Sequence, residues 1–170
     1  MQVNTETGAI VFTDIVGFTH FTEERGDDVA LALLERKEKL VRDALPDSGR
    51  VVKELGDGLL LWFGNACDAV TTCVGLQVNF EREATDDLPL WVRMGLHWGC
   101  PRRRGDDILG HDVNLAARIV ELAGPGEVLC SAAAVEAAGD VPGLRFEELG
   151  PVYVRGLEEP VPLLRAVLAL

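Results

Sequence analysis

The chain has 170 residues, of which 48% are hydrophobic, enough for one folded domain with a core but short for two. Its formal net charge of −12 argues against a nucleic acid or an anionic membrane surface as partner, because both bind to positively charged faces. The sequence shows neither a secretory leader pattern nor an apolar run long enough to span a bilayer. We therefore expect a single cytoplasmic domain over residues 1–170, with no nucleic acid and no membrane as partner.

The cysteines point to the same compartment. Two of the four lie in segments with apolar periodicity, and none forms a C-x-x-C pair. This pattern is more typical of reduced thiols in a core than of disulfides or a zinc site. The four are Cys67, Cys73, Cys100 and Cys130.

An apolar strand near the start of the chain leads into a carboxylate. Residues 9–12 are apolar, and Asp14 follows them just before a turn of small residues that includes Gly17. Mg²⁺ prefers oxygen ligands and borrows several of them from substrate phosphates, so a carboxylate beside free backbone N–H groups suits a nucleotide triphosphate. Asp at a strand end is also a common turn former or helix cap, and this segment alone leaves both interpretations open.

A helix and a hairpin follow. Asp27 or Asp28 can cap a helix whose apolar positions keep helical spacing until Pro46. Residues 50–63 form two apolar runs broken by a Gly-Asp-Gly segment, which is the pattern of a hairpin with Asp57 at its tip. The chain thus has a second carboxylate at the end of a strand.

The next two elements have clear periodicity. Residues 66–80 place their apolar side chains on one helical stripe, in which only Gln77 is polar. Residues 90–98 alternate as a strand does, and Arg93 and His97 lie on the face that points away from the core. A half-exposed His on a strand usually bonds to near neighbours, so we expect His97 to have a structural role.

A polar connection and a third helix come next. Residues 101–107 contain a run of three Arg, which we expect to form a solvated loop or to reach a partner subunit. Asp112 can cap a helix that ends at Gly124. Asn114 and Arg118 lie four residues apart, so their side chains emerge one turn from each other on a polar strip of this helix.

The last third of the chain has short elements. We expect a strand over residues 127–130, an alanine-rich helix capped by Ser131, and strands over residues 144–155 and 161–168. Strands and helices alternate along the whole sequence, but hairpins also occur. This combination favours an α+β fold over a purely parallel sheet.

Five segments of the sequence resemble the class III nucleotidyl cyclase catalytic domain, and most of all that of a bacterial adenylyl cyclase. They are FTDIVGFT (residues 12–19), KELGDG (53–58), VRMGLH (92–97), DILG leading to VNLAAR (107–118) and RGLEEPV (155–161). The resemblance covers nearly the whole chain. It implies a ferredoxin-like βαββαβ core with additional strands and helices, and a head-to-tail homodimer whose active sites form between the two domains.

The resemblance also implies a reaction and its metal ions. The ribose 3′-oxygen of ATP would attack the α-phosphate of the same molecule, which gives 3′,5′-cyclic AMP and releases pyrophosphate. Asp14, Asp57 and the carbonyl of Ile15 would hold two Mg²⁺ or Mn²⁺ ions in each active site. Such ions offset the repulsion between two carboxylates that lie together near phosphates.

The same resemblance assigns roles in substrate binding and catalysis to further residues. Asn114 would position the ribose, and Arg118 would stabilise the transition state at the α-phosphate, a task that suits a planar guanidinium with five donors. Asp14, Asp57 and Arg93 would serve a site from one chain, and Lys53, Asp107, Asn114, Arg118 and Arg155 would reach it from the other. The residues implied to bind phosphate are Arg93, Arg155, Gly17, Phe18 and Thr19.

Lys53 and Asp107 are implied to read the base. Adenine has an acceptor at N1 and a donor at N6, which an ammonium and a carboxylate complement. In guanylyl cyclases, the position that resembles Lys53 is a Glu. Guanylyl cyclase is therefore the alternative enzyme. A silent cyclase-like module for nucleotide binding or dimerisation is another alternative, but it would typically lack a metal-binding Asp or the Asn–Arg pair. The chain departs from the family at Asp106, where a bulkier apolar or aromatic residue is preferred, and at Ala117, which replaces a common Ser.

Overall fold

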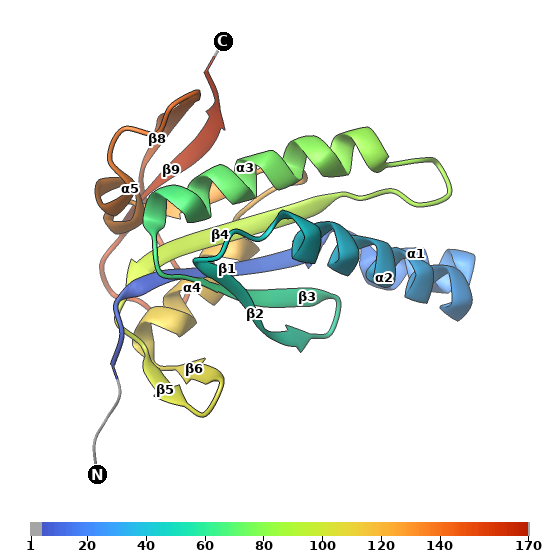
Figure 1. Cartoon of the computed structure of the whole chain (residues 1–170), viewed down its shortest axis with the longest axis horizontal. Helices are drawn as coiled ribbons and strands as arrows, with labels where there is room; N and C mark the ends of the chain where they lie inside the picture. Colours follow the sequence, from blue (N-terminus) through green and yellow to red (C-terminus); the bar gives the residue numbers. More distant parts are fainter. Residues whose placement is uncertain (1–4, 170) are drawn as a thin grey trace.

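A computed structural model describes residues 5–169, in which strands and helices alternate along the chain (Figure 1). The strands are β1 (Gly8–Ile15), β2 (Gly49–Leu55), β3 (Gly58–Phe63), β4 (Val92–Gly99), β5 (Arg102–Arg104), β6 (Asp107–Leu109), β7 (Val128–Ser131), β8 (Leu144–Val152) and β9 (Val161–Leu168). The helices are α1 (Phe18–Arg25), α2 (Asp27–Ala44), α3 (Ala66–Glu83), α4 (His111–Glu121) and α5 (Ala132–Ala138). The predicted single domain also includes residues 1–4 and 170, which lie outside the described part, and it stays a prediction.

The main sheet has the strand order β2-β3-β1-β4-β7-β9-β8. Neighbouring strands in it are antiparallel except β4 and β7, which are parallel. The first four strands, with α1 and α2 before β2 and with α3 before β4, form the βαββαβ unit. The structure therefore confirms the predicted α+β fold with a ferredoxin-like core and additional strands and helices.

Helices cover both faces of this sheet. In Figure 1, α2 and α3 lie in front of the sheet and α4 lies behind it. A large apolar cluster joins the front helices to the sheet, and a smaller one behind it contains Ile10, Leu60 and Ala116. Gly95 of β4 allows α4 to pack this closely, because a Cβ atom at residue 95 would lie only 2.4 Å from the backbone nitrogen of Val120.

The structure corrects the predicted exposure of His97. The residue is 7% exposed and therefore buried rather than half-exposed, because α4 covers the face of β4 on which it lies. Its Nδ1 lies 2.7 Å from Ser131 Oγ, and its Nε2 lies 3.0 Å from Asp112 Oδ1. Asp112 Oδ2 in turn accepts a hydrogen bond from the backbone N–H of Cys100. His97 is thus satisfied by near neighbours, as predicted, and these bonds tie the start of α4 to β4 and β7.

Both helix starts that we assigned to aspartates were wrong. Gly26 (φ 92°) caps α2 and Gly110 (φ 127°) caps α4, conformations that favour glycine. The predicted caps Asp27, Asp28 and Asp112 lie inside the first turns instead, where their negative charge still suits the positive end of the helix dipole. By contrast, Ser131 caps α5 as expected, since its Oγ accepts from the backbone N–H of Ala134.

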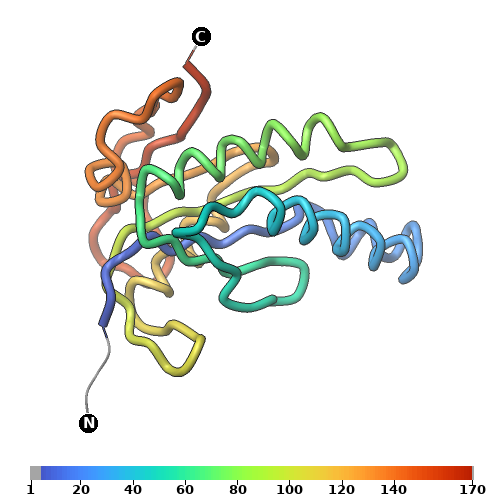
Figure 2. The backbone as a smooth tube through the Cα atoms, in the orientation of Figure 1, coloured from blue at the N-terminus to red at the C-terminus, as the bar shows by residue number. Residues whose placement is uncertain are grey.

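Three other segments differ from the prediction. Helix α1 replaces part of the predicted turn, and none of its residues is buried, so it has no apolar stripe that the sequence could reveal. The polar segment 101–107 is not a loop, because Arg102–Arg104 pairs with Asp107–Leu109 to form the β5–β6 hairpin, which projects from the sheet in Figure 2. Strand β8 ends at Val152, which leaves Arg155 in the following turn rather than in a strand.

The cysteines are reduced, as the composition predicts. All four cysteines are free, and Cys73 and Cys130 are buried. Burial raises the pKa of the Cys130 thiol to about 12, so it stays protonated in the core. Within residues 5–169, no helix is long and apolar enough to cross a membrane.

Candidate active site

Two carboxylates lie together at adjoining strand ends. Strands β1 and β3 are antiparallel, with Thr13 opposite Leu59, so Asp14 at the end of β1 lies beside the β2–β3 turn that carries Asp57. The backbone N–H of Ile15 donates to Asp57 Oδ2 over 3.1 Å. The structure therefore brings together the three residues that the sequence assigned to metal binding.

These two carboxylates strongly affect each other. Burial and the adjacent Asp14 raise the pKa of Asp57 to about 6. Burial would also raise the pKa of Asp14, but hydrogen bonding to Asp57 and the guanidinium of Arg93 outweigh it, and the pKa is lowered. Two acidic groups held this close in a partly buried place are stabilised by a nearby cation.

Sequence analysis missed Lys37, which supports the same turn. Lys37 is 1% exposed, and its Nζ donates to the backbone carbonyl of Asp57 over 2.7 Å. Burial lowers the pKa of this ammonium to about 8, against the opposing charges of Asp57 and Asp14. A signal was present, because Lys37 lies on the buried stripe of α2 midway between Leu33 and Val41, four residues from each.

Arg93 links the carboxylates to α4. It lies opposite Asp14 in the β1–β4 register, and its Nη2 and Nε lie 2.7 and 3.1 Å from Asp14 Oδ2. Its Nη1 donates to the backbone carbonyl of Glu121 over 3.1 Å. A cavity of about 240 Å³ is lined by Asp14, Asp57, Arg93, Ala117 and Glu121, among others. Arg93 thus reaches away from the main core, as predicted, and into this cavity.

The remaining arginines of the predicted site meet at one acid that the sequence did not indicate. Arg118 Nη1 lies 3.4 Å from Glu121 Oε1, and Arg155 Nη2 lies 3.2 Å from the same oxygen. Glu121 ends α4, one turn after Arg118. Asn114 lies near the start of the same helix and is exposed. Residues 114 and 118 therefore share the helix that crosses the back of the sheet.

The predicted base-reading residues form a pair of their own. Lys53 Nζ on β2 lies 3.0 Å from Asp107 Oδ2 on β6, and each side chain is 40% exposed. The hydrogen bond from Lys53 lowers the pKa of Asp107. Ile108, which is 2% exposed, holds β6 against the sheet, while the backbone carbonyl of Asp106 accepts from Arg50. The β5–β6 hairpin therefore sets the position of Asp107.

The predicted phosphate-binding turn starts α1. Gly17 has φ 73° and precedes the helix, which begins at Phe18 and has no side-chain cap. Backbone N–H groups in the first turn of a helix have no acceptor within the helix, and they attract anions. Thr19 is exposed in this turn, whereas Phe18 packs partly against the core.

Comparison with known proteins agrees with this arrangement of motifs. The family model of the adenylate and guanylate cyclase catalytic domain matches residues 2–164. The chain belongs to this family. Strand β1, the β2–β3 turn, β4 and α4, which carry the predicted site residues, all lie inside the matched range of the cyclase domain.

Curated relatives are longer than this cyclase domain. Putative adenylate cyclase 3 of Rhizobium meliloti (strain 1021) is 30% identical over 164 residues, which cover 94% of this chain and 28% of the relative. A pH-sensitive adenylate cyclase of Mycobacterium tuberculosis is 31% identical, and the match covers 92% of this chain and 39% of the relative. The chain thus spans less than half of the length of either.

Solved structures share the fold. The adenylyl cyclase CyaB from P. aeruginosa superposes with a TM-score of 0.87 at 23% identity, over 100% of this chain and 98% of that one. The guanylyl cyclase Cya2 superposes with a TM-score of 0.83 at 23% identity, over 99% and 96% of the two chains. Because one is named for adenylyl and the other for guanylyl chemistry, the fold alone does not select the base.

The residues present suit hard divalent cations. Asp14, Asp57 and the Ile15 carbonyl offer oxygen ligands only, which Mg²⁺ and Mn²⁺ accept. Within residues 5–169, no group of three or more His, Cys, Asp or Glu side chains is placed to hold a metal. A site with so few protein ligands fits a cation that takes its other ligands from water and substrate phosphates.

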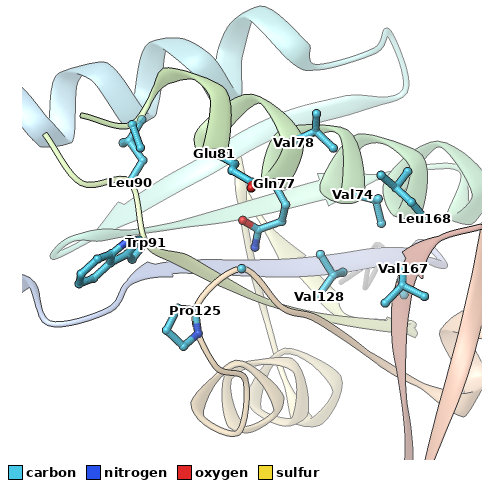
Figure 3. A pocket seen from close by; sticks show the side chains of 13 residues that line it. Val74, Gln77, Val78, Glu81, Leu90, Trp91, Pro125, Val128, Val167 and Leu168 are labelled. Carbon is cyan, nitrogen blue, oxygen red and sulfur yellow. The ribbon is translucent and has the colours of Figure 1, made fainter. Parts of the chain in front are cut away.

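A larger cavity of the cyclase domain lies elsewhere. It has a volume of about 630 Å³, between α3, the start of β4, β7 and β9 (Figure 3). Its lining is mostly apolar, with Trp91 and Val128 among the residues shown, and its charged residue is the acid Glu81. Gln77, the polar residue on the α3 stripe, donates to the carbonyls of Val92 and Glu127 at its edge. A cavity lined by an acid and no cation does not suit a triphosphate, so its size does not make it the active site.

Proposed function

We propose that this cyclase domain is an adenylyl cyclase that converts ATP to 3′,5′-cyclic AMP and pyrophosphate. The observation that carries the proposal is the pair of adjacent carboxylates, of which Asp57 accepts from the N–H of Ile15 and Asp14 accepts from Arg93. Cyclisation needs such a centre because negative charge accumulates on the phosphates and on the attacking ribose oxygen. The two relatives named as adenylate cyclases support the same reaction class.

Each predicted site residue has one task in this proposal. Asp14, Asp57 and the Ile15 carbonyl hold two Mg²⁺ or Mn²⁺ ions, which when bound lower the pKa of the ribose 3′-hydroxyl and offset phosphate charge. Arg93 and Arg155 bind the outer phosphates, together with the backbone N–H groups of Gly17, Phe18 and Thr19. Arg118 donates to the α-phosphate as its charge grows, and Asn114 orients the ribose.

Two chains are needed for one site in this proposal. Asp14, Asp57 and Arg93 serve ATP from one chain of a homodimer, whereas the side chains on α4, β2 and β6 reach it from the partner. In support, Lys53 and Asp107 are each 40% exposed and Asn114 is exposed, so they can meet a ligand held by another chain. A two-fold axis would then give two equivalent composite sites.

Selection of adenine rests on Lys53 and Asp107. Their 3.0 Å contact shows that an ammonium and a carboxylate lie side by side at the tip of the β5–β6 hairpin. Adenine N1 accepts from the first, and its N6 amino group donates to the second. Guanine offers the reverse pattern at these positions and would leave charged groups unpaired, which costs affinity.

The test is to identify the product. The purified chain is incubated with ATP or GTP and with Mg²⁺ or Mn²⁺, and the nucleotides are separated by chromatography. We expect cyclic AMP from ATP, little cyclic GMP from GTP, and no cyclic product from the Asp57→Asn variant at equal metal concentration. Faster turnover of GTP than of ATP would indicate a guanylyl cyclase instead. Absence of any cyclic product from the wild-type homodimer would refute cyclase activity.

A further inference from the structure

Glu121 contacts all three arginines that we assign to the phosphates. Its carboxylate is 3.4 Å from Arg118 Nη1 and 3.2 Å from Arg155 Nη2, and its backbone carbonyl accepts from Arg93 over 3.1 Å. It also lines the cavity that contains Asp14 and Asp57. In the proposed homodimer, Arg118 and Arg155 reach the ATP held by the partner chain, so the contacts with these two arginines place the Glu121 carboxylate beside basic groups of that composite site.

In the other ion pairs of the proposed site, each of the two residues has an assigned role in binding ATP or its metal ions. Asp14 pairs with Arg93, and Lys53 pairs with Asp107. Glu121 is different, because it has no assigned contact with metal, ribose, base or phosphate. Its carboxylate uses the same guanidinium donors that phosphate oxygens would use. A phosphate that binds Arg118 or Arg155 must therefore displace Glu121 or share donors with it.

The exposure of these ion pairs indicates whether Glu121 strengthens or weakens phosphate binding. Glu121 is 44% exposed, Arg118 39% and Arg155 71%, so the pairs are well solvated and hold the arginines weakly. Weak pairs contribute little to ordering the arginine side chains for substrate. The negative charge of Glu121 nevertheless remains beside an incoming triphosphate and repels it. Competition and repulsion thus outweigh any benefit from positioning.

We propose that Glu121 sets the substrate affinity of the site by competing with the triphosphate for Arg118 and Arg155. The inference rests on the proposed function for the identity of the substrate. Glu121 acts through these two arginines without touching the substrate, and it favours ligands with enough negative charge to replace it. Ligands without phosphates do not compete with Glu121.

The test compares wild type with Glu121→Gln, which removes the charge and keeps the length of the side chain. The KM for ATP and the Kd of inorganic triphosphate, both with Mg²⁺, should fall about two- to tenfold, as expected for the loss of two exposed ion pairs. The inhibition constant of adenosine should not change, because adenosine carries no phosphate. Glu121→Asp should stay closer to wild type than Glu121→Gln. Glu136→Gln, at an exposed position on α5, controls for the change in net charge and should behave like wild type.

The outcomes separate this inference from the proposed function. Unchanged or weaker binding of triphosphate to Glu121→Gln overturns the inference, as does an equal gain in Glu136→Gln. Triphosphate binding is measured without turnover. If the wild-type protein makes no cyclic AMP but triphosphate binds more tightly to Glu121→Gln, the proposed function fails and the role of Glu121 stands.

Discussion

Lys37 is a buried charged side chain beside the proposed metal centre. It is 1% exposed, and its single described hydrogen bond runs to the backbone of Asp57 rather than to a carboxylate. Burying an ammonium is costly unless opposite charges lie near it, and here Asp57 and Asp14 provide them. Lys37 therefore connects the core of α2 to the position of the β2–β3 turn.

Replacing Lys37 by Met should impair turnover without unfolding the protein. Met fills a similar volume but leaves the Asp57 carbonyl without its donor, so the melting temperature should fall modestly while the protein stays folded, and the Asp57 turn loses its anchor. A hydrogen bond from a charged group contributes about 1.5–3 kcal/mol, so kcat/KM should drop about ten- to hundredfold. Lys39→Met, at an exposed position of the same helix, is the control. Equal activities of the two variants would show that the anchor is unimportant.

The base-reading pair gives a second residue-scale prediction. Replacing Lys53 by Glu turns the donor offered to adenine N1 into an acceptor, and replacing Asp107 by Ala removes the acceptor for the N6 amino group. ATP turnover should fall about tenfold or more, because each mismatched group costs about 1–3 kcal/mol. GTP turnover should stay poor, since Ala117 and the exposed Asp106 depart from the family at the pocket walls. Steady-state kinetics on both nucleotides check this, and an unchanged preference for ATP would exclude these residues from base selection.

Local sequence signals explain which site residues could be predicted. Asp14 and Asp57 follow apolar strands and precede glycine-containing turns, patterns that are visible in a few neighbouring residues. Lys37 and Glu121 take their roles largely from contacts with residues that are distant in sequence, and neither lies in one of the five segments that resemble the cyclase family. Their charges were visible, but their partners were not.

At the level of elements, α4 is held against the sheet by close packing and by a buried polar network. Gly95 lets the backbone of α4 approach β4, and the side chains of His97 and Asp112 bond to each other over 3.0 Å at the start of the helix. The same helix carries Asn114 and Arg118. Its position on the sheet therefore determines where these two side chains lie.

Adding one methyl group at Gly95 should displace α4. A Cβ atom there would meet Val120 N at 2.4 Å, which is backbone and cannot rotate away, so Gly95→Ala should destabilise the fold by about 1–3 kcal/mol and reduce turnover. Gly75→Ala on α3 is the matched control, because no atom lies within 4 Å of the new methyl. It should stabilise the helix by about 0.5–1 kcal/mol. Urea unfolding of both variants measures this, and equal stabilities would contradict the packing argument.

Periodicity predicted the elements that have a buried stripe or an alternating face. It failed for α1, which has no buried residue, and for β5 and β6, three residues each, whose pairing depends on the anchor at Ile108. It also misplaced two helix starts, because a glycine with positive φ can begin a helix without a capping side chain. Short or exposed elements leave too few hydrophobic positions to form a recognisable pattern.

For the whole molecule, the ferredoxin-like βαββαβ core that the family resemblance implies is confirmed, while the pairing of two chains remains a proposal. One chain brings together Asp14, Asp57 and Arg93 on one side and Lys53 with Asp107 on another. The proposed mechanism needs the first group of one chain and the second group of its partner in one site. In the proposal, Asn114 and Arg118 of α4 act with the second group.

Mixing two inactive variants tests this central claim most directly. Asp14→Ala and Arg118→Ala should each form inactive homodimers, and subunit exchange should give heterodimers in which one of two sites keeps every group. Since about half of the dimers are then mixed, cyclic AMP production should recover to about a quarter of the wild-type rate at equal total protein. Mass spectrometry of differently tagged chains would establish the exchange. Full exchange without recovered activity would contradict a site shared between two chains.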